Sequence, residues 1–165
     1  AAALAEAGDL AVDRLTGDAI LAAMDDWQAV VSASWQGQDP RAVGDTAADW
    51  GFHRALAGNG ALFLMRLKGR PVACLRLLEH RDVAYVHTMN FDRALRDKAP
   101  GLVLFDHMMR DSAERAFRRV DFNGNSDFYA RWATGETPHV ALRFYATTLR
   151  GRLARTLRRI TVRGG

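Results

Sequence analysis

Apolar and polar positions along this chain follow two periods, and the change from one to the other predicts the order of its elements. The first part reads as one strand and two helices, over residues 10–17, 17–35 and 46–57. We expect Thr16 or Asp18 to cap the first helix and Thr46 to cap the second, because side-chain oxygens accept the free N–H groups of a helix start. The segment 36–45 is dense in Gly, Pro and Asp and is predicted to be a loop.

The middle of the chain predicts three antiparallel strands and then a crossover. The strands are expected over 61–69, 70–80 and 82–91. A tight hairpin at Lys68-Gly69-Arg70 joins the first two. A helix over about 101–116 leads to a strand over 117–124, and a helix between two strands indicates a right-handed parallel connection. The apolar stripe of this helix is assigned to Leu102, Phe105, Met109, Ala113 and Ala116.

The end of the chain is predicted to add a short helix, a strand and a basic helix, over 126–134, 139–148 and 150–160. Ser126 is the expected cap of the short helix. Helices that interrupt a mixed sheet indicate a layered α/β domain. We therefore predict a single domain over 1–165, with a mixed, mostly antiparallel central sheet flanked by helices.

Composition narrows the class of protein. With 165 residues, 48% of them hydrophobic, the chain is long enough to bury a core. It has no run of about 20 apolar residues and no signal-peptide pattern at its start, so we expect no transmembrane helix and a cytoplasmic location. Cys74 lies in an apolar run and is predicted to be a buried, inert thiol. The five histidines show no metal-ligand spacing, so no metal is expected.

Charge is distributed unevenly along the chain. The net charge is +4, yet residues 1–50 hold nine acidic residues and two arginines, which gives −7 there and +11 in the remainder. The Arg-rich predicted helix at the C-terminus contributes much of this excess. It indicates an anionic partner, such as a phosphorylated cofactor, nucleic acid or a membrane surface, or else a solvated face.

The stretch "RDKAPGLVLFDHMMR" (96–110) places a charged turn directly between a strand and a helix. A helix start leaves N–H groups free and carries the positive end of the helix dipole, so it can bind an anion. Arg96 and Lys98 would add positive charge, and Gly101 would permit close backbone approach. The alternative is an ordinary helix start with Pro100 near its first position.

Further short segments accompany this turn in a fixed order. They are Ser34-Trp35, "KGRPVACLRL" (68–77), Phe91-Asp92, Ala99-Pro100-Gly101-Leu102, Asp121-Phe122, Gly124 and "DFYARW" (127–132). Arg96, Ala99 and Gly101 fit a pattern of Arg or Gln, two residues, Gly or Ala, one residue, and Gly or Ala. Together, over about residues 30–150, these segments resemble the GNAT superfamily of acetyltransferases, in its FemAB/CelD-like branch. Ala130 departs from that branch, which often has Lys there.

This resemblance implies acetyl-CoA or another acyl-CoA as the donor. It places the pantetheine arm against the strand backbone that runs from His87 through Thr88, Met89 and Asn90. It implies that the pyrophosphate is held by residues of the turn: Arg96, Lys98, Ala99, Gly101, Leu102 and Val103. Asn123, in a later turn, either bonds the arm or shapes that turn.

Transfer to an amine or hydroxyl acceptor needs a base for the acceptor's proton and an acid for the leaving thiolate. The resemblance makes Tyr129 the candidate acid; the alternative is that its ring simply packs against Trp132. His87 is the candidate base, because an imidazole titrates near neutrality. Strand alternation puts His87 on one face with Tyr85 and Met89. If that face is core, His87 is only a buried histidine.

Asp121 is a weaker candidate base, because a carboxylate at a strand end also serves to bind a nearby N–H or Arg. Three functions follow from the resemblance. The first is an acyl-CoA-dependent N- or O-acetyltransferase, in a bacterial polysaccharide or cell-envelope context. The others are a GNAT module that no longer catalyses, and an aminoacyl transferase that uses charged tRNA. A start at Ala1 rather than Met fits a fragment of a longer two-unit protein.

Overall fold

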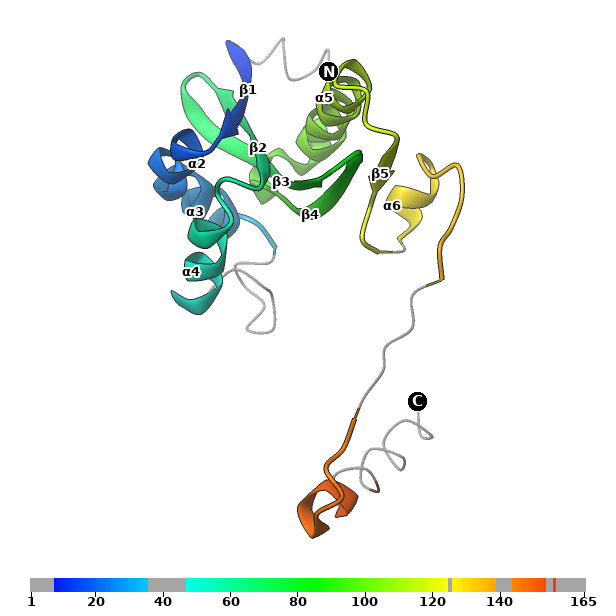
Figure 1. The fold of residues 1–165 in the computed structure, drawn as a ribbon. Coiled ribbons are helices and arrows are strands. Elements are labelled where there is room, and N and C mark those ends of the chain that lie inside the picture. Colours follow the sequence, from blue (N-terminus) through cyan, green and yellow to red (C-terminus); the bar gives the residue numbers. More distant parts are fainter. Residues whose placement is uncertain (1–7, 36–46, 125, 139–143, 154–155, 157–165) are drawn as a thin grey trace. The chain divides into compact units, whose positions relative to one another are not determined.

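The computed structural model describes residues 8–35, 47–124, 126–138, 144–153 and 156 (Figure 1). The chain divides into two compact units, residues 1–129 and 130–165. The first unit contains the sheet and the helices that cover it. The single domain expected over 1–165 stays a prediction.

The sheet has five strands in the order β1-β2-β3-β4-β5. They are β1 (Leu10–Thr16), β2 (Gly60–Leu67), β3 (Arg70–His80), β4 (Val83–Phe91) and β5 (Arg119–Asp121). The first four form an antiparallel meander, and β5 pairs with β4 in parallel. The hairpin between β2 and β3 turns through Lys68 and Gly69, both with positive φ. The mixed, mostly antiparallel sheet and its parallel crossover are therefore confirmed.

Helices cover both faces of this sheet (Figure 1). They are α2 (Asp18–Ala22), α3 (Met24–Ala33) and α4 (Ala47–Ala55) on one face, α5 (Pro100–Glu114) on the other, and the short η2 (Arg93–Lys98) and α6 (Asp127–Ala130). The single helix expected over 17–35 breaks at Ala23, which is the C-cap of α2 and the N-cap of α3 and has non-helical dihedral angles. The expected N-caps Thr16 and Asp18 are wrong, because Gly17 is the N-cap of α2 and no side chain accepts a hydrogen bond there. Thr46 and the loop 36–45 lie outside the described residues.

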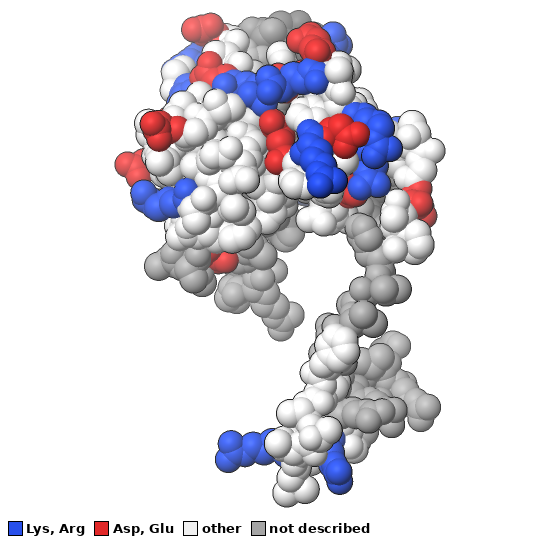
Figure 2. All heavy atoms as spheres, in the orientation of Figure 1, with Lys and Arg blue, Asp and Glu red and all other residues white. Residues whose placement is uncertain are grey.

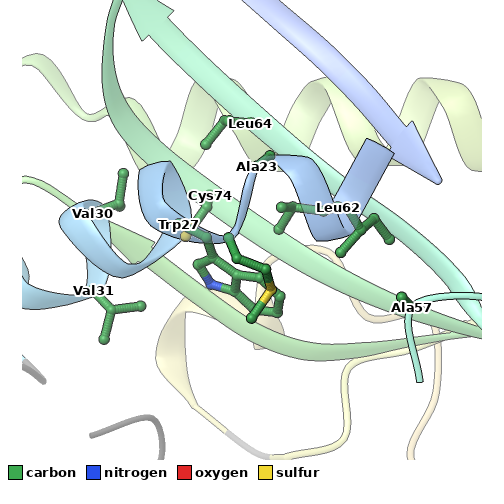
Figure 3. Close-up of a cluster of buried hydrophobic side chains, with 10 residues drawn as sticks. Ala23, Trp27, Val30, Val31, Ala57, Leu62, Leu64 and Cys74 are labelled. Atoms are coloured by element: carbon green, nitrogen blue, oxygen red, sulfur yellow. The ribbon is translucent and has the colours of Figure 1, made fainter. Parts of the chain in front are cut away.

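The core beneath α2 and α3 follows from helical spacing. Ile20, Met24, Trp27 and Val30 recur on one side of these helices and are at most 2% exposed. They pack against Leu62, Leu64 and Cys74 of the sheet (Figure 3). Cys74 is buried, which confirms that part of the prediction, and burial raises the pKa of its thiol well above the usual range.

The stripe expected on α5 is confirmed at Phe105, which is buried, and is wrong at Leu102, Ala113 and Ala116, because the helix is rotated relative to that assignment. Leu102 is 47% exposed, and Ala113 and Ala116 are exposed as well. The buried positions are Pro100, Gly101, Val103, Leu104, Phe105, Met108 and Ser112. A Cβ at Gly101 would lie 3.2 Å from Cδ1 of Phe91, so the absence of a side chain there lets the helix backbone approach β4 closely. This contact sets which side of α5 faces the sheet.

Where charged side chains of the first unit gather in Figure 2, Lys and Arg lie beside Asp and Glu. Arg14 of β1 bonds both Glu79 of β3, at 2.6 Å, and Asp111 of α5, at 3.1 Å. Its side chain is only 20% exposed, so these bonds are less screened than those of a surface pair. They connect α5 to the sheet at the end away from Gly101.

In the second unit, residues 144–148 are not in a strand, so that part of the strand expected over 139–148 is wrong, and 139–143 lie outside the described residues. Residues 149–153 are helical and include Arg150 and Arg152. Leu149 and Leu153 are exposed at 84% and 61%. The rest of the expected basic helix, with Arg155 and residues 157–160, lies outside the described residues. Within the described part of the chain, every helix is too short or too polar to cross a membrane.

Candidate functional site

β4 contains a bulge that decides where its side chains point. Arg76 of β3 pairs with Thr88, but the next residue, Leu77, pairs with Val86, so His87 is the extra residue. The side chains of His87 and Thr88 therefore lie on the same face. Met89 lies on the other, 3.6 Å from the Cβ position of Gly101 on α5. The expectation that His87 and Met89 share a face is wrong, because the bulge shifts the alternation by one residue.

The second half of β4 has an open edge. The parallel ladder to β5 begins at Val83 and ends at Tyr85, which pairs with Asp121. Beyond Tyr85, residues 86–91 pair with β3 on one side and have no strand partner on the other among the described residues (Figure 1). Main-chain N–H and C=O groups on such an edge are available to a ligand that carries amides.

A line of hydrogen bonds joins this part of β4 to the end of α3. Thr88 donates from Oγ1 to Oδ1 of Asn90 at 3.0 Å, and Asn90 donates from Nδ2 to Oγ of Ser34 at 3.4 Å. Ser34 in turn donates to the carbonyl of Val31 at 2.7 Å. Ser34 and Asn90 are buried, so these bonds fix the distance between helix and strand.

An aromatic and imidazole cluster lies beside His87. His53 of α4 is 3% exposed, and its ring centroid lies 4.5 Å from that of Trp27 and 5.4 Å from that of His87. The ring centroid of Phe52 lies 5.7 Å from that of His87. Burial, and then the charges of His87 and Arg76, lower the pKa of His53 to about 4. Burial and Arg76 also lower the pKa of His87. Both rings are therefore neutral at physiological pH.

Arg76 is a buried charge within this region. Its guanidinium donates to the carbonyls of Ala61, Leu77 and Leu56 at 2.6–2.9 Å, and the residue is 0% exposed. Burial lowers the pKa of Arg76 to about 10, so it stays protonated at neutral pH. Sequence reasoning missed both Arg76 and His53. The spacing of Trp50, His53 and Ala57 on one side of a predicted helix was the available signal for His53.

The turn after β4 is built around two backbone features. Asp92 caps η2 by accepting the N–H of Ala94 at 2.9 Å, and its other oxygen bonds Arg70 at 2.6 Å. Ala99 then takes a left-handed conformation with φ 50° and ψ 50°, directly before Pro100, the first residue of α5. Ala99 is therefore the single residue between η2 and α5 and caps both.

The N–H groups of this turn are partly in use. Those of Leu102 and Val103 both donate to the carbonyl of Ala99, at 3.0 and 3.3 Å, and Ala99 donates to Arg96. Pro100 has no N–H. The N–H of Gly101 has no hydrogen-bond partner among the described residues. Arg96 is exposed and Lys98 half-buried, so the turn offers one free donor and two positive side chains.

Tyr129 belongs to a second aromatic cluster. Its ring stacks on Phe122 with centroids 5.2 Å apart and an angle of 19°, and it also contacts Phe105 and Phe128. The N–H of Tyr129 donates to Oγ of Ser126 at 3.3 Å, which confirms Ser126 as the cap of α6. Burial raises the pKa of Tyr129, so its hydroxyl holds its proton at neutral pH.

Asp121 and Asn123 bind each other at the end of β5. Oδ1 of Asp121 accepts the N–H of Asn123 at 2.9 Å, and Oδ2 lies 3.8 Å from Arg119. Asn123 is exposed and has a φ of 51°, as a tight turn requires. These contacts fit the alternative left open for Asp121, that of binding a nearby N–H and Arg.

Comparison with known proteins identifies the fold. Residues 1–131 match the family model described as an acetyltransferase (GNAT) domain. None of the curated proteins matches the chain. Among solved structures, an aminoglycoside acetyltransferase from an uncultured soil metagenomic sample, in complex with sisomicin, is 18% identical with a TM-score of 0.55. That alignment covers 84% of this chain and 96% of the other.

Two further structures show the same likeness. The ribosomal-protein-alanine N-acetyltransferase from Brucella melitensis biovar Abortus 2308 is 14% identical with a TM-score of 0.60, over 81% of this chain and 99% of the other. The aminoglycoside N-acetyltransferase AAC(6')-Iy in complex with CoA is 12% identical with a TM-score of 0.56, over 82% and 94%. At these identities the likeness shows the fold. The FemAB/CelD-like branch stays a prediction.

Proposed function

Because the chain belongs to the acetyltransferase (GNAT) domain family, we propose that it transfers an acyl group from acyl-CoA to an amine or hydroxyl acceptor. The open edge of β4 after Tyr85 supports this proposal most directly. Such an edge suits a ligand whose amide groups replace the missing strand, and the pantetheine arm of CoA carries two amides in line. The polysaccharide or cell-envelope context of the FemAB/CelD-like branch is part of the prediction from sequence.

In this proposal the main chain of His87, Thr88, Met89 and Asn90 holds the pantetheine arm. The free N–H of Gly101 and the side chains of Arg96 and Lys98 bind the pyrophosphate, at the positive end of the α5 dipole. Ala99, Leu102 and Val103 shape this turn through their own hydrogen bonds.

The protonation states of His87 and Tyr129 at neutral pH suggest which of them accepts a proton and which donates one. The acceptor attacks the thioester carbon, a C–N or C–O bond forms, and the C–S bond breaks. His87, neutral at physiological pH, takes the proton that the acceptor loses. Tyr129, whose hydroxyl is protonated there, gives a proton to the leaving thiolate.

One observation favours a second candidate, a GNAT module that binds weakly or does not catalyse. Among the described residues, Gly101 alone offers a free N–H at the start of α5, since Pro100 has none and Leu102 and Val103 donate to the carbonyl of Ala99. The binding of a pyrophosphate at this turn would therefore depend strongly on the side chains of Arg96 and Lys98.

Calorimetric titration with acetyl-CoA separates the two candidates. We expect binding by the wild-type chain and at least a tenfold loss in an Arg96→Ala/Lys98→Ala variant, because two charge-assisted contacts are removed. Arg115→Ala, an exposed arginine at the other end of α5, is the matched control and should bind as the wild type does. No binding at millimolar acetyl-CoA would contradict acyl transfer and favour the non-catalytic module.

A further inference from the structure

Several polar atoms around His53 lack hydrogen-bond partners. Within the described part of the chain, no hydrogen bond uses a ring nitrogen of His53 or His87. Nε1 of Trp27, whose ring contacts His53, and Nε of Arg76 are fully buried without a partner there. Because buried polar groups are nearly always hydrogen-bonded, this concentration of unpaired groups indicates a place where a ligand atom binds.

The charge that acts on both imidazoles is positive. Arg76 lowers the pKa of His53 and of His87, and its hydrogen bonds run to main-chain carbonyls. Two acidic groups oppose it. Asp49 raises the pKa of His53 but is not among the groups that shift His87, and Glu79, which acts on Arg76, is itself bonded to Arg14 at 2.6 Å.

We propose that the acceptor's reacting group binds at His53 and His87 in uncharged form, as a hydroxyl or an unprotonated amine, and that the site discriminates against an alkylammonium ion. This inference rests on the proposed acyl transfer and specifies its acceptor class. It makes His53 a binding residue alongside His87.

Hydrogen-bond capacity supports this choice. A neutral imidazole has one donor and one acceptor nitrogen, and a hydroxyl can donate to one ring while it accepts from the other. An ammonium ion has donors only, so it cannot accept from either ring. It would also bring a second positive charge near the buried guanidinium of Arg76, whose charge already disfavours protonation of both imidazoles.

The step balances without a further reactant. The acceptor's O–H or N–H bond breaks and its proton passes to the free nitrogen of His87. The new C–O or C–N bond forms as the C–S bond breaks, and the thiolate takes a proton from Tyr129. For an uncharged acceptor, no earlier deprotonation of an ammonium is required.

Two small nucleophiles test this inference without knowledge of the natural acceptor. Hydroxylamine is uncharged at neutral pH, whereas ethylamine is an ammonium ion there. Acetyl transfer from acetyl-CoA to each, at the same total concentration, is measured by mass spectrometry of the product, and the non-enzymatic rate of the same probe is subtracted. We expect the enzymatic rate with hydroxylamine to exceed that with ethylamine at least tenfold.

A pair of variants at Phe52 tests the charge argument. Phe52 is 48% exposed, and its ring lies 5.7 Å from that of His87, so substitution there places a new group near the site without opening the core. Phe52→Glu adds a negative charge, and Phe52→Gln adds a side chain of the same size without charge. We expect Phe52→Glu to shift the preference toward ethylamine by roughly three- to tenfold relative to Phe52→Gln. An NMR pH titration of the His87 ring should show a higher midpoint in Phe52→Glu.

The outcomes separate this inference from the proposed function. Equal enzymatic rates with both probes, an equal preference in the two Phe52 variants, or acetyl-CoA binding without turnover of either probe overturns the inference. Failure of the wild-type chain to bind acetyl-CoA overturns the proposed acyl transfer instead. In that case the NMR titration still decides on the histidine pair, because equal His87 midpoints in the two variants would show that charge at residue 52 does not reach the site.

Discussion

Replacing His53 by Phe should make the protein more resistant to acid. The wild-type ring is 3% exposed, and its pKa falls from 6.5 to about 4 on folding. Between these values the unfolded chain binds a proton at residue 53 that the folded protein does not. Stability from this group is therefore present above pH 6.5 and is lost as the pH falls toward 4.

The size of this effect follows from the two pKa values. Each unit of difference corresponds to about 1.4 kcal/mol, so the full loss is about 3 kcal/mol, most of it reached near pH 4.5. A phenyl ring fits the same position among Trp27, Trp50 and Phe52, and it has no proton to bind. The variant should therefore lose about 3 kcal/mol less than the wild type on acidification.

Urea unfolding followed by circular dichroism at about pH 7 and about pH 4.5 measures this difference directly. His107→Phe, at an exposed position on α5, controls for the loss of one histidine. It should lose as much free energy of unfolding as the wild type. Equal losses in the wild type and His53→Phe would refute the assignment of His53 as a buried neutral imidazole.

Three further substitutions test the packing and the chemistry. Arg76→Met leaves the carbonyls of Leu56, Ala61 and Leu77 without their donor and should lower the free energy of unfolding by about 3–5 kcal/mol. Arg66→Met removes only partly exposed ion pairs and should lower it by at most about 1 kcal/mol, so similar losses in the two variants would contradict the buried role of Arg76. Gly101→Ala places a Cβ 3.2 Å from Cδ1 of Phe91 and should lower the melting temperature. Gly51→Ala, in α4 with no atom within 4 Å of the new Cβ, should raise the melting temperature by relieving the entropic cost of a helical glycine, and a change in the same direction for both variants would be evidence against the close approach of α5 to β4. Tyr129→Phe keeps the ring stacked on Phe122 and should leave stability and acetyl-CoA binding unchanged, while the turnover number falls about a hundredfold. An unchanged turnover number would mean that Tyr129 is not the acid that protonates the leaving thiolate.

The sequence was most informative where a local rule acts alone. The Lys68-Gly69 turn predicted the β2–β3 hairpin because few residues take positive φ there, and the strand–helix–strand order predicted the parallel connection of β4 to β5. Ser126 was found as a cap for the same reason, since a hydroxyl before a short helix has an N–H within reach.

The face of α5 could not be determined in this way. The helix begins with four apolar residues in a row, Leu102, Val103, Leu104 and Phe105. The positions of apolar residues therefore do not show which side of the helix is buried, and several apolar stripes fit the sequence equally. The contact of Gly101 with Phe91 decides the rotation, and that contact joins two different elements. The bulge at His87 is likewise a property of the pairing between β3 and β4 and leaves no mark on the period of either strand.

What the sequence by itself determined is the order of the strands β1 to β5 and of α4, α5 and α6 among them, and the class of the sheet, because each depends on neighbouring residues. Only the tertiary structure decided which groups share a site. It brought His53 of α4 to His87 of β4, buried Arg76 against carbonyls from three segments, and left one edge of β4 after Tyr85 without a strand partner in the described part of the chain. These features depend on contacts between residues distant in the chain, whose energies come from burial and pairing rather than from local preference.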